Sequence, residues 1–109
     1  MAQFILMLRD HGRVLPDMSP EELQQITSRY RAWMQKVSAT GQKLRDGEGR
    51  VVVRRDGGTS VTDGPFAESR EIIGGYFAIE ANDYDEAVKL AGDCPHLDFG
   101  SIEIRAIES

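Results

Sequence analysis

The sequence predicts an α+β fold, a two-layer sandwich in which two helices cover one face of an antiparallel sheet. Three observations support it. A continuous apolar run opens the chain, two segments with helical periodicity each follow a capping residue, and the last segment alternates between apolar and polar side chains. The expected order is strand, helix, hairpin, strand, helix, strand, and elements in this order build such a sandwich.

Residues 3–9 are expected to form the first strand. The run from Phe4 to Leu8 is apolar at every position, which is typical of a strand covered on both faces. Because two helices can cover only one face of a sheet, the other face needs a partner. We therefore predict a homodimer in which a second copy covers that face.

The first helix has a well-marked start. Ser19 is the expected N-cap, Pro20 takes the first helical position, and Glu22 completes a capping box. Apolar side chains then recur at helical spacing: Leu23, Ile26, Tyr30, Trp33, Met34 and Val37. Gly41 follows the last of them and is predicted to end the helix.

A β-hairpin is expected next. Residues 51–53 are β-branched, residues 56–58 read Asp-Gly-Gly, and residues 59–62 form the returning arm. This arm leads into a corner at residues 63–65, Asp-Gly-Pro, where the proline fixes φ and the aspartate can bond nearby backbone N–H groups.

The remaining elements follow in short succession. A strand over residues 76–81 comes after the pair Gly74-Gly75, and Asp83 with Glu86 marks the start of the second helix. Gly92 and Pro95 are predicted to end that helix. Residues 101–107 alternate and form the last strand.

Composition narrows the class of protein. The 109 residues, with 40% hydrophobic and 28% charged, fit a single globular domain spanning 1–109. No apolar run is long enough to span a bilayer, and the first residues do not resemble a signal peptide. The single cysteine, Cys94, fits a reducing cytoplasm and is expected to pack in the core.

Charge is unevenly distributed along the chain. The net charge is −5, which argues against general affinity for nucleic acid. Residues 29–55 nevertheless carry +6 and the remainder −11. This basic third, with Arg54 as its candidate ligand-binding residue, is either a solvated surface, a site for an anionic ligand, or one of two complementary faces between subunits.

Several motifs together resemble the YCII-related family, in its DGPF-domain branch. They are Val61-Thr62-Asp63-Gly64-Pro65-Phe66 with Glu68, Gly74-Gly75-Tyr76, Cys94-Pro95-His96-Leu97, Ser101-Ile102-Glu103-Ile104-Arg105, Met18-Ser19-Pro20-Glu21-Glu22 and Ala32-Trp33. The resemblance covers nearly the whole chain. It implies a ferredoxin-like protomer that pairs, sheet against sheet, into a dimeric α/β barrel. It also implies a His–Asp pair in some members, and a regulatory or ancillary role for the branch.

The candidate catalytic residues are the two histidines and one carboxylate. Either His11 or His96 could act as a general base near neutral pH, with Asp63 orienting the ring. The alternative for Asp63 is a turn carboxylate bonded to backbone N–H groups. The alternative for His96 is a helix-cap or surface position, and for His11 it is simple exposure to solvent.

Ligand-binding candidates lie around the same corner. Trp33, Phe66 and Tyr76 could line an apolar pocket, although Trp33 also fits the helix core. Glu68 either contacts a ligand or pairs with Arg70 at the surface. The spacing of the histidines and the cysteine does not suggest a metal site, and the glycines lack the context of a nucleotide site, so we expect no cofactor.

Two functions remain open from the sequence. The first is a dimeric module that binds a small organic ligand, with anions among the candidates, near the Asp-Gly-Pro-Phe turn and serves a regulatory or ancillary role. The second is a cofactor-independent enzyme, an isomerase, lyase or hydrolase of a small organic acid, that uses an Asp–His pair.

Overall fold

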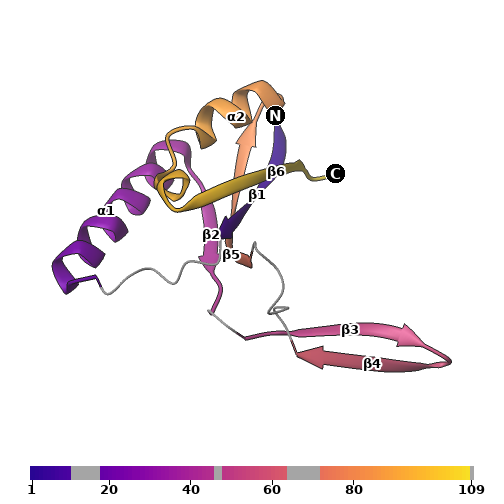
Figure 1. The fold of residues 1–109 in the computed structure, drawn as a ribbon. Coiled ribbons are helices and arrows are strands. Elements are labelled where there is room, and N and C mark those ends of the chain that lie inside the picture. Colours follow the sequence, from indigo (N-terminus) through magenta and orange to yellow (C-terminus); the bar gives the residue numbers. More distant parts are fainter. Residues whose placement is uncertain (11–17, 46–47, 64–71, 109) are drawn as a thin grey trace.

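The computed structural model describes residues 1–10, 18–45, 48–63 and 72–108. Figure 1 shows their arrangement. The elements are β1 (Ala2–Asp10), α1 (Pro20–Val37), β2 (Thr40–Lys43), β3 (Arg50–Arg55), β4 (Gly58–Asp63), β5 (Ile72–Ala81), α2 (Tyr84–Ala91), the 3₁₀ helix η1 (Pro95–Asp98) and β6 (Gly100–Ala106). The predicted Asp-Gly-Pro-Phe corner beyond Asp63 lies outside the described residues.

Four strands form the main sheet, in the order β2-β5-β1-β6, and every neighbouring pair is antiparallel. Both helices lie on the same side of this sheet (Figure 1). The predicted α+β fold, with an antiparallel sheet and two helices, is therefore confirmed. The architecture is consistent with a ferredoxin-like fold.

The core lies between the helices and one face of β1. Phe4, Leu6 and Leu8 are buried there, whereas Ile5 and Met7, which alternate with them, are only half-buried on the opposite face. Trp33 of α1 packs edge-on against Phe77 of β5, with ring centroids 5.0 Å apart. The two helices thus cover one set of β1 side chains and leave the other open, as the sequence predicted.

The start of each helix matches its predicted cap. Ser19 Oγ accepts a hydrogen bond from the Glu22 N–H at 3.2 Å, and Asp83 Oδ1 accepts one from the Glu86 N–H at 2.9 Å. Glu86 Oε1 in turn accepts from the Asn82 N–H at 3.0 Å. Each side chain satisfies an N–H that the first turn of a helix leaves without a partner.

The predicted end of α1 at Gly41 is wrong. The helix stops at Val37, and Ser38 takes the left-handed conformation (φ 55°) while the Ala39 N–H bonds to the Met34 carbonyl at 2.8 Å. Gly41 instead lies in β2, where a Cβ would collide with the carbonyl of Tyr76. The four polar or small residues of β2 carry no alternation from which a strand could be predicted.

The predicted hairpin is confirmed as a separate two-stranded sheet of β3 and β4. Asp56 (φ 48°) and Gly57 (φ 81°) both have positive φ, which is the conformation of a type I′ turn, and they place Arg55 opposite Gly58. Figure 1 shows this hairpin projecting from the body of the protein, away from both helices.

Neither helix within the described ranges has the length and apolar character needed to cross a membrane.

The cap of α2 gives a first testable prediction. Replacing Asp83 with alanine leaves the Glu86 N–H without its acceptor and should lower the free energy of unfolding by about 1 kcal/mol. Asp83→Asn keeps an acceptor oxygen and serves as the matched control, with a stability close to the wild type. Urea denaturation followed by circular dichroism measures both. Equal losses in the two variants would contradict the cap as the source of the effect.

Candidate functional site

A polar cluster lies at the end of β1, beside the apolar core. Its centre is His96 of η1, which is only 5% exposed. The ring nitrogen Nε2 lies 3.1 Å from the Arg9 carbonyl oxygen and 3.6 Å from Asp10 Oδ1, and Nδ1 lies 3.3 Å from the Tyr30 hydroxyl. The histidine therefore connects β1, α1 and η1 at one point.

The hydrogen-bond partners of the His96 ring indicate which of its two nitrogens carries a proton. A carbonyl oxygen can only accept, so Nε2 carries the proton and donates it to Arg9. In the neutral ring Nδ1 is then an acceptor, and the Tyr30 hydroxyl donates to it. Burial, followed by the neighbouring Cys94 and Asp10, raises the pKa of Tyr30, so its hydroxyl keeps the proton that this bond requires.

Two glycines make room for this cluster. A Cβ at Gly74 would collide with the Asp10 carboxylate, and a Cβ at Gly100 would collide with the Arg9 carbonyl and lie 3.1 Å from His96 Nε2. Side chains at these positions would displace the carboxylate or the ring. The close approach of these groups thus explains Gly74 of the Gly74-Gly75 pair. The pair was predicted to precede a strand over residues 76–81, but it lies inside β5, which begins at Ile72.

Asp10 is the part of the cluster that a ligand can reach. Its side chain is 34% exposed, whereas that of His96 is 6% exposed. A carboxylate in this position can accept a hydrogen bond or a proton from a bound molecule, and the fixed imidazole behind it keeps its surroundings polar. The arrangement can therefore bind a hydrogen-bond donor, and it has the parts for a proton transfer.

The carboxylate beside His96 is that of Asp10, a residue that the sequence did not mark as a candidate. The predicted partner, Asp63, lies at the end of β4, where it is exposed and has Arg50 Nε at 3.3 Å. The expectation that His96 is a cap or surface residue is wrong, because the ring is buried against β1 and α1. His11, Phe66 and Glu68 lie outside the described residues.

The other predicted ligand residues occupy three different places. Trp33 is buried in the core, and its indole N–H donates to the Leu90 carbonyl at 2.9 Å, which joins α1 to the end of α2. Tyr76 is 37% exposed on the sheet, and Arg54 is exposed on the hairpin. Cys94 is buried as predicted, and this burial raises the pKa of its thiol.

Comparison with protein-family models finds a match along nearly the whole chain. The model of the YCII-related domain matches residues 2–109. The chain belongs to the YCII-related family. A search of curated proteins found no match.

In this YCII-related protein, a cluster of three charged side chains lies on the sheet face that the helices leave open: Arg9, Glu103 and Arg105. Arg9 donates to Glu103 Oε1 through Nη2 at 2.6 Å and through Nε at 3.2 Å, and Arg105 Nη1 lies 3.6 Å from Glu103 Oε2. The hydrogen bond from Arg9, supported by the charges of both arginines, lowers the pKa of Glu103 despite some desolvation. Glu103 therefore stays ionised to lower pH than usual.

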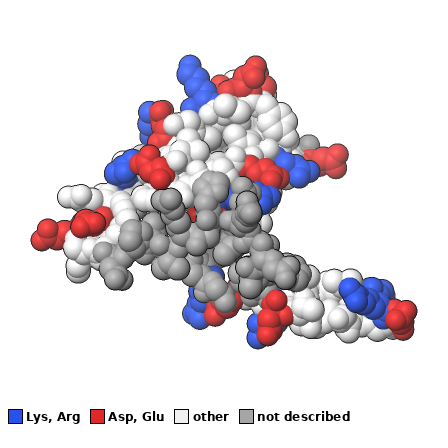
Figure 2. Space-filling model, viewed as in Figure 1, with Lys and Arg blue, Asp and Glu red and all other residues white. Residues whose placement is uncertain are grey.

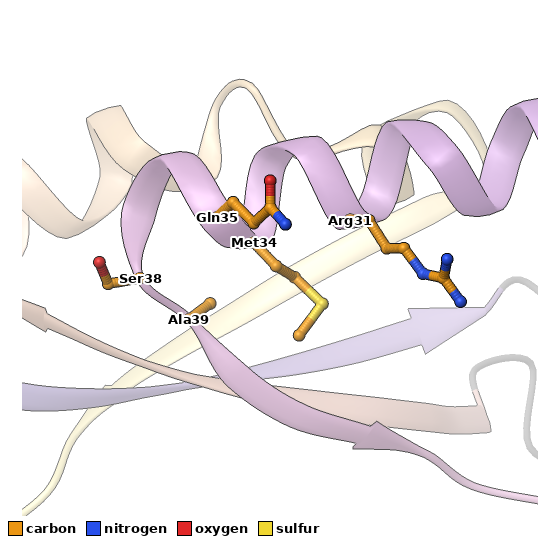
Figure 3. A pocket seen from close by; sticks show the side chains of 5 residues that line it. All are labelled: Arg31, Met34, Gln35, Ser38 and Ala39. Carbon is orange, nitrogen blue, oxygen red and sulfur yellow. The ribbon is translucent and has the colours of Figure 1, made fainter.

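A shallow pocket of the YCII-related fold lies along the second half of α1 and the two residues that follow this helix. It measures about 440 Å³, is wide open to solvent, and is lined by Arg31, Met34, Gln35, Ser38 and Ala39 (Figure 3). Figure 3 shows the Met34 side chain directed toward the sheet, while Gln35 points away from it. None of the sequence-predicted site residues lines this pocket. Within the described ranges, no group of three or more histidine, cysteine or acidic side chains could hold a metal ion.

The hydroxyl of Tyr30 gives the second testable prediction. Tyr30→Phe leaves the buried Nδ1 of His96 without its donor and should lower the free energy of unfolding by about 1–3 kcal/mol. Tyr76→Phe removes a hydroxyl from an exposed side chain and should leave stability within about 0.5 kcal/mol of the wild type. ¹⁵N NMR of the imidazole should show the Nε2–H tautomer in the wild type. A predominant Nδ1–H tautomer would contradict the assignment.

Proposed function

We propose that this chain forms a homodimer that binds a small organic ligand at Asp10, as a regulatory or ancillary module. The observation that carries the ligand site is the half-exposed Asp10 carboxylate in front of the buried His96 and Tyr30. The dimer rests on a separate feature, the open face of the main sheet.

The open face has an apolar centre and a charged rim. Ile5 lies opposite Ala78, and Met7 lies opposite Tyr76, so these four side chains are neighbours on two adjacent strands. Burying each large apolar side chain contributes about 1.5–3 kcal/mol. A second copy, related by a twofold axis, would bury all of them twice and pair the two sheets as a dimeric α/β barrel.

The ligand site lies on the other side of the sheet. β1 alternates, so Asp10 shares a face with Leu8 and the core, and the site belongs to a single protomer. A ligand that donates a hydrogen bond, such as a hydroxylated organic molecule, would meet the Asp10 carboxylate with the apolar core close by. The half-buried carboxylate gives such a bond more strength than an exposed one would.

The predicted turn beyond Asp63 is a second place for ligand contacts. Asp63, Phe66 and Glu68 stay predicted ligand or catalytic residues, and so does His11. The possible role of Arg54 toward an anionic ligand also stays a prediction. The same holds for the DGPF branch and for the cytoplasmic location inferred from the single cysteine.

A second candidate function is proton transfer without a cofactor. It is favoured by the exposure of Asp10, because a carboxylate that a substrate can reach can act as a general base, and its Oδ1 lies 3.6 Å from His96 Nε2. Asp10 would take a proton from a carbon or oxygen of the substrate, leave the electron pair on the substrate, and return the proton at another atom. This sequence of steps is an isomerisation, and it needs no added reductant or oxidant.

The dimer gives the third testable prediction. The wild type should sediment at twice its chain mass of 12.1 kDa at micromolar concentration. Met7→Lys places a charge at the centre of the open face and should shift the protein to monomer with its circular dichroism spectrum unchanged. Val88→Lys, at a 57% exposed position of α2, is the control and should remain dimeric. A monomeric wild type would contradict the dimer.

The ligand site gives the fourth testable prediction. Phenol, catechol and benzyl alcohol serve as probes in ¹H–¹⁵N NMR titrations, and we expect shifts centred on residues 9–10, 30 and 96–100. Asp10→Asn should weaken binding about tenfold or more, because a hydrogen bond to a charged group contributes about 1.5–3 kcal/mol. Asp85→Asn, on an exposed carboxylate of α2, is the control and should bind the probes like the wild type. Equal binding to both variants would place the ligand elsewhere.

The enzyme candidate is separated from simple binding by isotope exchange. In D₂O, the wild type should accelerate exchange at the acidic C–H of acetylacetone, and Asp10→Asn should not. If the phenolic probes bind but no variant-dependent exchange occurs, the proton-transfer function is wrong while the ligand site stands.

A further inference from the structure

We propose that the β3–β4 hairpin is a docking arm that binds a second copy of this chain, and that it supplies part of the dimer interface beyond the sheet face. This inference rests on the dimer proposed above. The hairpin is a second interface surface. It is separate from the open face of the sheet, and the family match does not imply it.

The first argument is that the hairpin lacks a covered face. It forms its own sheet of two strands and projects from the body (Figure 1), in a molecule whose principal extents are 48 × 41 × 19 Å. A two-stranded hairpin alone in water is marginally stable at best, because it has no layer to bury its side chains against. A partner that covers one face would remove this weakness.

The second argument is the apolar surface of the arm. Val52 and Val61 face each other across the two strands and are 64% and 56% exposed. Val53, on the opposite face of the hairpin, is 43% exposed. These β-branched residues suit a strand, but the exposed pair of Val52 and Val61 gives one face of the hairpin an apolar centre that favours contact with another surface.

The third argument is the size of the open sheet face. At strand spacings of ~4.8 Å, four strands measure ~19 Å across, and about seven residues at ~3.3 Å give a footprint of roughly 440 Å². A stable interface typically buries about 800 Å² on each partner. One face of the hairpin, measured in the same way, would add roughly 200 Å² of footprint, so the arm would enlarge the contact by roughly half.

Charge favours a second copy as the occupant. Residues 50–63 carry a net charge of +1, while the rest of the chain carries −6. Figure 2 shows basic side chains next to an acidic one at the outer end of the hairpin, where Arg54 and Arg55 precede the turn residue Asp56 and are exposed. In a twofold dimer each arm would bring these arginines to the acidic body of the other copy, and the two contacts would be equivalent.

The experiment is sedimentation equilibrium of the full chain with the arm altered in two independent ways. Val52→Thr combined with Val61→Thr keeps the β-branched shape while removing apolar surface, and should raise the dimer dissociation constant about tenfold or more. Val88→Thr makes the same change at a 57% exposed valine off the arm and should have no effect. Cross-strand NOEs confirm that the hairpin is still formed.

The second alteration tests charge. Arg54→Glu combined with Arg55→Glu should also weaken the dimer at low ionic strength, and the difference from the wild type should shrink in 1 M NaCl. A wild-type dimer with both arm variants unchanged would overturn the docking arm while leaving the sheet-face dimer intact. A monomeric wild type would overturn both. Equal weakening by Val88→Thr would also overturn the arm, because the effect would then not be specific to it.

Discussion

The structure depends on β1 and on the different environments of its two faces. As an inner strand of the main sheet it pairs with β5 on one side and β6 on the other, so its register fixes theirs. Phe4, Leu6 and Leu8 fill the space beneath the helices, and the alternate side chains remain on an open face. Because side chains alternate along a strand, the same strand supplies the core from one set of positions and the proposed interface from the alternate set.

The end of β1 carries the candidate site for a related reason. The strand alternation that buries Leu8 also brings Asp10 to the core side, where His96 lies across from it. A buried imidazole is costly unless both nitrogens have partners, and the Arg9 carbonyl and the Tyr30 hydroxyl supply them. The polar cluster is therefore part of the packing, with Asp10 as its accessible member.

Local signals in the sequence predicted much of the fold, since caps, the type I′ turn and the continuous apolar run of β1 act over a few residues. β2 was missed because its four polar or small residues carry no alternation. The end of α1 was misplaced because Ser38 took the left-handed position expected of a glycine. The pairing of Asp10 with His96 was missed because it depends on where η1 packs. Arg9 and His96 are 87 positions apart, and no spacing rule joins them.

The most direct test of this account is an isotope-filtered NOE experiment on a dimer assembled from labelled and unlabelled chains. If the open face of β1 is the interface, the Met7 and Ile5 methyl groups of one copy should show NOEs to the open-face side chains of the other. The same experiment should show no intermolecular NOEs from Leu6, which lies in the core of each protomer. A stable dimer whose intermolecular NOEs avoid Ile5 and Met7 would contradict the account.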